Sequence, residues 1–404
     1  MAKKLKIFII AGEVSGDILG AKIMRALAQL QAKIEFSGVG GENMAAAGLR
    51  SIFPISDLAV MGFFEVLARV RILTRRIRET SDAILKFQPD IVLTIDSPSF
   101  AKAVIKKIKL KERRAQSADK KIPSLFALRS SLFYHVVAPQ VWAWGERRAK
   151  KYAELFDRLY CFFDFEVLWF TKYGLETIPV GHPIADGLSA KRKEKREKRK
   201  EIDVALIPGS RMGEVKKLLP VLRCAAEMMR CKNPKVLYNF YIPVVETTEK
   251  YVREQTADWC SRPEIVPAPA RYDLFRKIDL AIAASGTVTA ELAILHVPAV
   301  VIYRMNPFTT MLARIFVKTK WASLVNILLR RTVYPELLGD PPLLCIGATG
   351  RYVTTENIVR EVSRISTPAA RAKMIAELSR ADDMWTRQGK SAAKLIAESI
   401  LKYN

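Results

Sequence analysis

The sequence contains few of the residues that build metal centres and disulfide frameworks. Its 404 residues include five cysteines, which lack CxxC spacing, and three scattered histidines. These numbers and spacings predict neither a zinc site nor a disulfide framework, and they fit a reducing compartment. No apolar run approaches the roughly 18 residues of a membrane span, and the apolar stretch at residues 7–11 is too short for a signal peptide. The sequence therefore predicts a cytosolic or peripheral protein without a metal site.

Acidic residues are also scarce relative to basic ones. The chain has 66 Lys and Arg against 41 Asp and Glu, a formal net charge of +25. Such an excess predicts an anionic partner, which can be nucleic acid, an anionic membrane surface or phosphorylated substrates. The charge is spread along the chain and no nucleic-acid motif accompanies it, so nucleic acid is the weakest of the three.

Buried-strand patterns alternate with helical patterns in two successive sets, which predicts an α/β fold. The first set of strands is expected at residues 5–11, 34–39, 89–96, 133–138, 159–163 and 177–180. The second set is expected at residues 202–207, 236–242, 264–266, 279–284 and 299–303. Between them, eight of the ten residues at 191–200 are basic. We predict Rossmann-like domains at 1–187 and 188–375, and a helical tail at 376–404 that packs on the first domain or on a partner subunit.

Two loops of the second half have the composition of anion sites. Ser285, Gly286 and Thr287 follow one predicted strand, and Gly209, Ser210 and Arg211 follow another. A strand that ends in small residues and opens a helix presents free backbone N–H groups and the positive end of the helix dipole to a phosphate. Arg211 can pair bidentately with phosphate. Glu291, about one turn into its helix, could accept hydrogen bonds from a sugar hydroxyl. Together these features indicate a site for a nucleotide; the alternative is that the loops are ordinary turns between strands and helices.

The first half offers polar residues after two of its strands. The loop that contains Glu13, Ser15, Gly16 and Asp17 lacks the G-x-G-x-x-G fingerprint, and it is either a substrate-contacting loop or a capped tight turn. Asp96 stands just past the carboxyl end of a predicted strand, where ligands collect in open α/β sheets. A carboxylate there can act as a general base, or it can cap the next helix.

Residues 58–78 combine an apolar stretch with a cluster of arginines that follows it. The apolar residues expected to contact lipid are Val60, Met61, Phe63, Phe64, Val66 and Leu67. A helix of this kind can lie in a membrane interface with its cations near anionic head groups. It can also be a core helix whose basic end is solvated.

An ordered set of motifs resembles one family, the lipid-A-disaccharide synthases, which are glycosyltransferases of the GT-B fold. The motifs are AGEVSGDILGA (11–21), LAVMGFFEVL (58–67), IDSPSF (95–100), PQVWAW (139–144), VGHP (180–183), LIPGSR (206–211), SGTVTAEL (285–292), YRMNPFT (303–309) and SLVNILL (323–329). They follow the family's order and span most of the chain. The resemblance implies the α/β GT-B fold, with two Rossmann-like domains facing a cleft.

The resemblance also implies a reaction and roles for individual residues. The family transfers the 2,3-diacylglucosaminyl group of UDP-2,3-diacylglucosamine to 2,3-diacylglucosamine 1-phosphate and inverts the anomeric centre. By position, Asp96 is then the general base on the acceptor hydroxyl. The loops at 209–211 and 285–287 bind the diphosphate, and Glu291 and Asn326 contact ribose or uracil. No cofactor and no metal are implied.

The implied setting is a homodimer, built by exchange of C-terminal parts, that contacts the anionic inner membrane of a Gram-negative-type bacterium from the cytoplasm. No nucleic-acid partner is implied. Residues 111–131 are longer and more basic than the family's usual connection, and they add lipid contact or are inert.

Another GT-B enzyme, such as a UDP-sugar epimerase or a peptidoglycan-type transferase, would share the nucleotide loops but not IDSPSF. A basic RNA- or membrane-binding scaffold is an alternative from another class.

Overall fold

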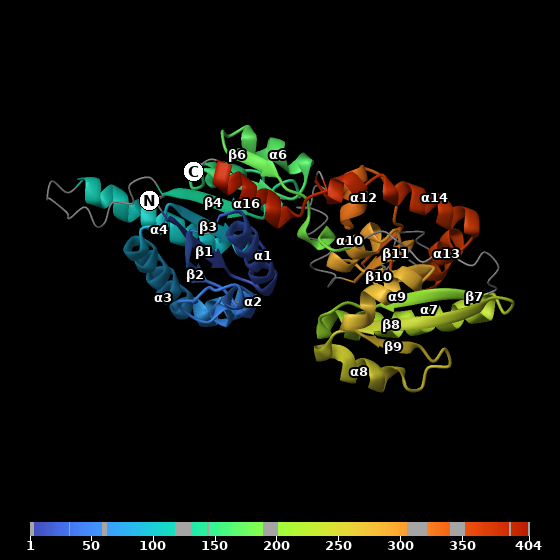
Figure 1. Ribbon diagram of the computed structural model, residues 1–404. Helices are drawn as coiled ribbons and strands as arrows, with labels where there is room; N and C mark the ends of the chain where they lie inside the picture. Colours follow the sequence, from blue (N-terminus) through green and yellow to red (C-terminus); the bar gives the residue numbers. More distant parts are fainter. Residues whose placement is uncertain are drawn as a thin grey trace. The chain divides into compact units, whose positions relative to one another are not determined.

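The structure is a computed structural model that describes residues 4–31, 33–58, 63–117, 131–143, 145–188, 201–304, 321–339, 352–387 and 389–402, without the side chains of 63–69 and 112–117. Figure 1 shows the elements in chain order. The chain divides into two units. The first unit is Met1–Asp186 together with Thr386–Asn404, and the second unit is Gly187–Trp385.

The first unit contains a six-stranded parallel sheet. Its strands are β1 (Leu5–Ala11), β2 (Ile34–Val39), β3 (Ile91–Ile95), β4 (Leu132–Val136), β5 (Arg158–Cys161) and β6 (Glu176–Pro179). Their order in the sheet is β2-β1-β3-β4-β5-β6. Alternate residues of β1 enter different cores, because successive side chains of a strand point to opposite faces. Ile7 and Ile9 belong to one buried cluster, and Phe8 and Ile10 belong to the other.

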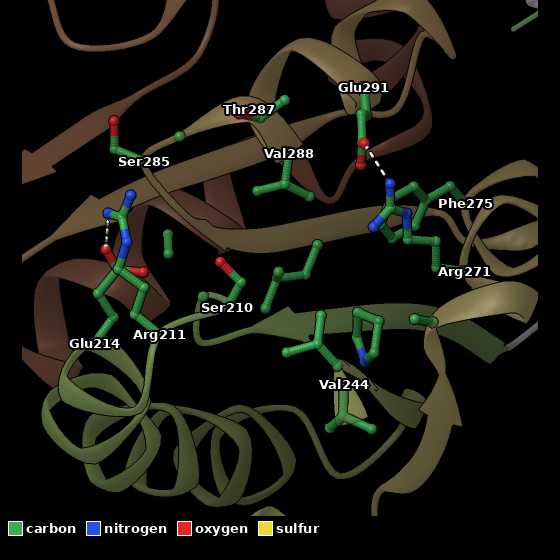
Figure 2. Close-up of a pocket in the computed structure, with 17 residues that line it drawn as sticks. Ser210, Arg211, Glu214, Val244, Arg271, Phe275, Ser285, Thr287, Val288 and Glu291 are labelled. Carbon is green, nitrogen blue, oxygen red and sulfur yellow. Dashed lines mark hydrogen bonds and ion pairs between the residues drawn. The ribbon is translucent and has the colours of Figure 1, made fainter. Parts of the chain in front are cut away.

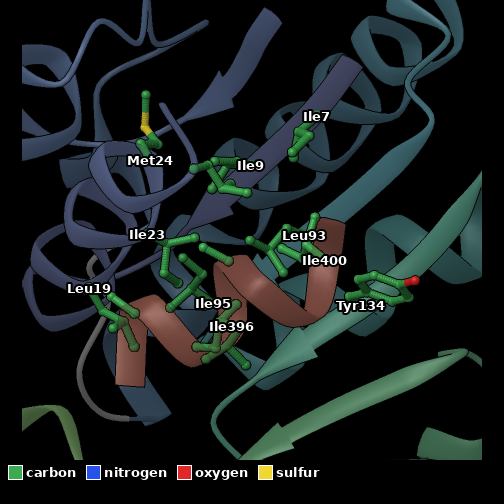
Figure 3. Close-up of a cluster of buried hydrophobic side chains, with 14 of the residues drawn as sticks. Ile7, Ile9, Leu19, Ile23, Met24, Leu93, Ile95, Tyr134, Ile396 and Ile400 are labelled. Atoms are coloured by element: carbon green, nitrogen blue, oxygen red, sulfur yellow. The ribbon is translucent and has the colours of Figure 1, made fainter. Parts of the chain in front are cut away.

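Helices cover both faces of this sheet. They are α1 (Val14–Leu30), α2 (Glu42–Ala46), α3 (Phe63–Phe87), α4 (Pro98–Ser117), α5 (Arg148–Ala153), α6 (Asp164–Thr171) and α16 (Ala392–Lys402). The last of these comes from the C-terminal segment of the chain. Its residues Ile396 and Ile400 are fully buried in one cluster with Ile23 of α1 and Ile95 of β3 (Figure 3). The core of the first unit therefore includes residues from both ends of the described chain.

The second unit contains another six-stranded parallel sheet. Its strands are β7 (Glu201–Ile207), β8 (Leu237–Val244), β9 (Glu264–Pro267), β10 (Leu280–Ala284), β11 (Ala299–Tyr303) and β12 (Glu336–Leu338), in the order β12-β11-β10-β7-β8-β9. Its helices are α7 (Met212–Lys232), α8 (Glu246–Thr256), α9 (Arg271–Lys277), α10 (Thr287–Ile294), α12 (Leu324–Leu329), α13 (Thr355–Ile365), α14 (Pro368–Ser379) and α15 (Asp382–Trp385). The direction of the strand order reverses between β7 and β10, which pair in parallel. A reversal of this kind is the usual ligand position in an open α/β sheet.

The structure confirms the predicted α/β architecture of two Rossmann-like domains. The way in which they face each other stays a prediction. Of the expected lipid contacts, Val60 and Met61 lie outside the described residues, as do the side chains of Phe63, Phe64, Val66 and Leu67, which belong to α3. Residues 118–130 of the basic connection also lie outside them. Within the described ranges, no helix combines the length and the apolar character that crossing a membrane requires.

Candidate functional site

The carboxyl ends of β7 and β10 open into a pocket of about 290 Å³ (Figure 2). Because Ala283 of β10 pairs with Ile207 of β7, the loops that follow these strands leave the sheet side by side. One loop enters α7 and the other enters α10. Seven of the eight residues predicted to bind the nucleotide line this pocket, namely Gly209, Ser210, Arg211, Ser285, Gly286, Thr287 and Glu291.

Two helix N-termini contribute positive potential to this pocket. The first N–H groups of a helix have no partner within the helix and lie at the positive end of its dipole. Here the N-termini of α7 and α10 both border the pocket. Gly209 has a φ of +107°, and a Cβ atom at this position would lie 2.6 Å from Oε2 of Glu214. A side chain at residue 209 would thus both strain the backbone and displace Glu214.

Arg211 contributes an exposed cation to the pocket. Its side chain is 66% exposed, and its Nη1 atom donates to Oε1 of Glu214 at 3.0 Å (Figure 2). An ion pair this exposed contributes little to stability. The guanidinium of Arg211 can therefore exchange this carboxylate for a phosphate at small cost.

Glu291 is the buried acid of the pocket, with 4% of its surface exposed. Its Oε1 atom accepts hydrogen bonds from Nη2 of Arg271 at 2.7 Å and from the hydroxyl of Tyr272 at 2.9 Å. Burial raises the pKa of Glu291, and the charge of Arg271 and the hydrogen bond from Tyr272 oppose that shift. No described residue donates to Oε2 of Glu291, so this oxygen can accept a hydrogen bond from a sugar hydroxyl.

Several residues of the site were missed in the sequence. Arg271 and Tyr272 begin α9, just after the carboxyl end of β9. Their position after a strand is the feature of the sequence that could have indicated that they belong to the site. Val244 and Phe275 form part of the apolar wall in Figure 2. Their sequence gives no signal, because buried apolar residues at strand ends and in helices occur throughout an α/β core. An apolar wall of this kind suits the flat face of a nucleobase.

Asn326 is the predicted nucleotide contact that does not line the pocket. It is fully buried in α12. Its Nδ2 atom donates to the carbonyl of Tyr334 and to Oε1 of Glu336, both at 2.8 Å. Its Oδ1 atom accepts from the N–H groups of Val333 and Tyr334 at 2.8 and 2.9 Å. Asn326 therefore ties α12 to the segment before β12, and its contact with a nucleotide stays a prediction.

Asp96 lies at the carboxyl end of β3 in the first unit. Asp96 and Ser97 have φ values of +54° and +44°. Two successive non-glycine residues in the left-handed region are strained, and such strain clusters at functional sites. Burial raises the pKa of Asp96, and the N–H group of Ser97, which donates to Oδ1 at 2.9 Å, opposes that shift. A raised pKa brings a carboxylate closer to the range in which it works as a general base.

The loop between β1 and α1 lies against the turn at Asp96. A Cβ atom on Gly12 would lie 1.9 Å from Oγ of Ser97, and one on Gly16 would lie 3.3 Å from the carbonyl oxygen of Ile95. Gly12 therefore permits the loop, and Gly16 permits the start of α1, to approach the end of β3 and the turn closely. The loop is shorter than expected from the sequence, because α1 already begins at Val14; Glu13 at the end of the loop and Ser15 in the first turn of α1 are both exposed.

Asp17, which was predicted together with them, is buried and faces α2. Its Oδ1 atom accepts from the N–H groups of Gly41 at 2.7 Å and Met44 at 3.0 Å. Its Oδ2 atom accepts from the N–H and Nδ2 groups of Asn43. Burial acts to raise the pKa of Asp17, but the hydrogen bonds from Asn43, Met44 and Gly41 lower it overall. This carboxylate therefore binds the N-terminus of α2, and its substrate contact stays a prediction.

Comparison with known proteins places the chain in a family. A family model described as lipid-A-disaccharide synthetase matches residues 7–341. The lipid-A-disaccharide synthase of Gluconobacter oxydans is 40% identical over 341 residues, which are 83% of this chain and 77% of the relative. That of Rhodospirillum centenum is 36% identical over 419 residues, which are 99% of this chain and 94% of the relative.

Among solved structures, the UDP-GlcNAc 2-epimerase of Neisseria meningitidis bound to UDP-GlcNAc has a similar fold. Its TM-score is 0.59 at 13% identity, over 98% of this chain and 100% of the other. That likeness supports the GT-B fold alone. The family model and the two synthases cover most of the sequence, and on that ground the chain belongs to the lipid-A-disaccharide synthetase family of glycosyltransferases.

Proposed function

We propose that the pocket of the second unit binds the UDP sugar donor and that Asp96 of the first unit activates the acceptor. As a member of its family, the enzyme transfers a 2,3-diacylglucosaminyl group from UDP-2,3-diacylglucosamine to 2,3-diacylglucosamine 1-phosphate. The products are the β-1,6-linked lipid A disaccharide 1-phosphate and UDP, with inversion at the anomeric carbon. The proposal concerns which residues bind the donor and which residue activates the acceptor.

The parallel pairing of β7 with β10 carries the donor assignment, because it brings two loop-to-helix anion sites into one pocket. In the proposed complex the diphosphate accepts hydrogen bonds from the first N–H groups of α7 and α10 and from Arg211. The ribose hydroxyls donate to Glu291. The Neisseria epimerase of similar fold was solved with UDP-GlcNAc, which supports the choice of a UDP sugar.

In the proposed reaction the carboxylate of Asp96 takes the proton of the acceptor hydroxyl as its oxygen attacks the anomeric carbon of the donor. The bond between that carbon and the diphosphate breaks, and UDP leaves with the electron pair. Arg211 and the helix N–H groups stabilise the charge that develops on the diphosphate. Donors fixed in place before the reaction stabilise such charge more effectively than water does.

Contact with an anionic membrane is a further part of the proposal. Both substrates are anionic lipids, and the chain carries a net charge of +25. On α3, Val70 and Ile72 are 45% and 43% exposed, and Arg71 between them is exposed as well. Exposed apolar side chains beside a cation suit the boundary between head groups and acyl chains.

The proposed homodimer is built by exchange of C-terminal parts. In the structure of the single chain, α16 packs in the first unit of its own chain. An exchanged dimer would place the same helix in the same position on its partner, and the mass of the enzyme in solution tests this arrangement.

The experiment is transfer of label from UDP-2,3-diacylglucosamine to 2,3-diacylglucosamine 1-phosphate, in detergent and with EDTA. The enzyme should form the disaccharide, and Asp96→Asn should lower turnover by roughly 100-fold or more, the contribution of a general base. Asn tolerates the left-handed backbone at this position, so the fold should persist.

UDP affinity of the Asp96→Asn enzyme is the control, because the donor pocket lies in the other unit. Full turnover by this variant would remove Asp96 from the chemistry. Binding of UDP without any disaccharide from the unaltered enzyme would instead favour another UDP-sugar enzyme of the GT-B fold, such as an epimerase or a peptidoglycan-type transferase.

A further inference from the structure

The pocket of the second unit contains a carboxylate that the mechanism above does not use. The charged residues that line it, among those the structure describes, are Arg211, Glu214, Arg271 and Glu291. Their positive and negative charges cancel, although the chain as a whole carries +25. Glu291 has the ribose as its proposed ligand, whereas a carboxylate at Glu214 repels a diphosphate. The place of Glu214 in the pocket therefore indicates a role other than tight binding of the ligand.

The carboxylate of Glu214 lies against the loop that is proposed to hold the diphosphate. Glu214 belongs to the first turn of α7, which follows this loop. Its Oε2 atom is 2.6 Å from the position that a Cβ atom on Gly209 would take. Its Oε1 atom accepts from Nη1 of Arg211 at 3.0 Å (Figure 2). Glu214 therefore places an anion beside Gly209 and Arg211, two of the residues proposed to bind phosphate.

Glu214 and a bound diphosphate would share one cation. Among the described residues, Arg211 alone donates a side-chain hydrogen bond to the carboxylate of Glu214. Donors of Arg211 that stay with Glu214 are lost to the phosphate, and donors that move to the phosphate leave two anions side by side. The side chain of Arg211 is 66% exposed, so solvent screens this repulsion and the ligand still binds.

We propose that Glu214 competes with the diphosphate for Arg211 and in this way makes the pocket prefer the donor over the product UDP. This inference rests on the proposed function. The terminal phosphate of UDP is a monoester with about 1.5 to 2 negative charges at pH 7. The same phosphate in the donor is esterified on both sides and has no second acidic group. Repulsion by Glu214 therefore acts more strongly on UDP, and it favours release of the product before the next donor binds.

A purely structural role of Glu214 makes the opposite prediction. A carboxylate in the first turn of a helix stabilises that helix through its dipole. Removal of a purely structural carboxylate loosens the start of α7 and weakens the binding of UDP. Removal of a competing carboxylate strengthens the binding of UDP. The direction of the change in UDP affinity therefore separates the two roles.

The test compares the unaltered enzyme with Glu214→Gln, which keeps the shape of the side chain and removes its charge. In calorimetric titration the variant should bind UDP roughly threefold to fivefold more tightly, the effect of releasing one exposed ion pair. The inhibition constant of UDP against the donor should fall by the same factor, whereas KM for the donor should fall roughly twofold or less. Glu214→Asp, which keeps the charge, should stay close to the unaltered enzyme in both constants.

A control variant and a control ligand complete the test. Glu356→Gln removes a charge from the first turn of α13, at an exposed position that does not line the pocket, and should change neither constant. Uridine, which has no phosphate, should bind Glu214→Gln and the unaltered enzyme equally. Unchanged or weaker UDP binding by Glu214→Gln, an equal gain for UDP and the donor, or an equal gain for uridine would overturn the inference. If the unaltered enzyme binds no UDP, the proposed donor pocket is wrong instead.

Discussion

Asp96 and Glu291 are two carboxyl groups whose pKa is raised by burial, and they differ in what opposes that shift. At Asp96 the opposing group is one backbone N–H, that of Ser97. At Glu291 it is the charge of Arg271 together with the hydroxyl of Tyr272. A carboxylate beside a fixed cation stays ionised and accepts hydrogen bonds, whereas one without a cation can take up a proton. The environment of Glu291 therefore suits the binding of ribose hydroxyls. The environment of Asp96 suits general base catalysis.

Arg271 should keep Glu291 ionised when UDP binds. Replacing Arg271 by Gln removes the charge that lowers the pKa of Glu291, so the pKa should rise further. A protonated Glu291 is a poorer acceptor for the ribose hydroxyls, and UDP affinity of Arg271→Gln should fall as the pH decreases from about 8 to about 6. The unaltered enzyme should show a weaker dependence. Calorimetric titration with UDP across this range measures both curves.

Two further variants control for the loss of a charge from α9. Arg271→Lys keeps a cation beside Glu291 and should restore much of the pH independence. Arg276→Gln removes a charge from the same helix at a position that does not line the pocket, where the arginine pairs with Asp273. If the UDP affinity of Arg271→Gln changes with pH in the same way as that of the unaltered enzyme, Arg271 does not govern the ionisation of Glu291.

The sequence predicts pocket residues well where the signal is local. Gly209, Ser210 and Arg211 follow a strand and precede a helix, and this succession is visible in the order of the residues. The bond between Arg271 and Glu291 joins residues 20 positions apart, and it depends on how β9 and β10 are placed in the sheet. The nucleotide contact of Asn326 is an expectation from the family resemblance, and the sequence does not show what else this side chain binds. In the structure it binds backbone groups seven and eight residues away and the carboxylate of Glu336.

Among the elements, buried parallel strands were predicted to within one or two residues. They are continuous apolar runs, because helices cover both of their faces. The strand β12 was missed, since it has three residues and begins with Glu336. This glutamate is buried, and its carboxylate accepts hydrogen bonds from the N–H groups of Ala322 and Ser323. A charged residue in so short a segment hides the strand pattern.

The helix α3 extends to Phe87, nine residues beyond the predicted end at residue 78. The extension contains Thr80 and Ser81, which favour turns and are fully buried here. Their hydroxyls donate to the carbonyls of Arg76 at 2.7 Å and Ile77 at 2.6 Å, within the same helix. Polar residues can thus continue a helix when their hydroxyls bond to its own carbonyls.

The helix α16 should contribute strongly to the stability of the first unit. Ile396 is fully buried against α1 and the sheet, so Ile396→Ala should lower the free energy of unfolding by about 2–5 kcal/mol. Denaturation in urea, followed by tryptophan fluorescence, measures this loss. Lys394→Ala is the matched control, because Lys394 is exposed on the same helix. Similar unfolding midpoints for the two variants would contradict the packing of α16 in this core.

For the whole molecule, the excess of positive charge leads to a prediction about membranes. The enzyme should sediment with vesicles of phosphatidylglycerol and phosphatidylethanolamine. Raising the salt from about 0.1 M to about 0.5 M should release it, because salt screens the attraction between its cations and the lipid phosphates. Vesicles of phosphatidylcholine alone are the control. Equal and salt-insensitive binding to both kinds of vesicle would show that charge does not direct the enzyme to membranes.

The two successive sets of strands and helices were readable in the sequence, since each set contains its own alternating pattern. The return of the chain to the first unit depends on contacts between residues far apart, such as the hydrogen bond of 3.1 Å between the hydroxyls of Tyr160 and Ser399. No local pattern encodes such a contact. The amphipathic character of the last helix predicts that it packs against something, and the sequence alone leaves its partner open.

The place of α16 also has a consequence for the order in which the enzyme matures on the ribosome. Domains generally fold as units while they are synthesised, beginning with the earliest. Here the second unit, Gly187–Trp385, is translated before the helix that completes the core of the first. The pocket of the second unit can therefore form while the nascent chain is still held at the ribosome. The first unit, which contains Asp96, has part of its core exposed until α16 has been synthesised. The first unit therefore begins to fold first and completes its folding last.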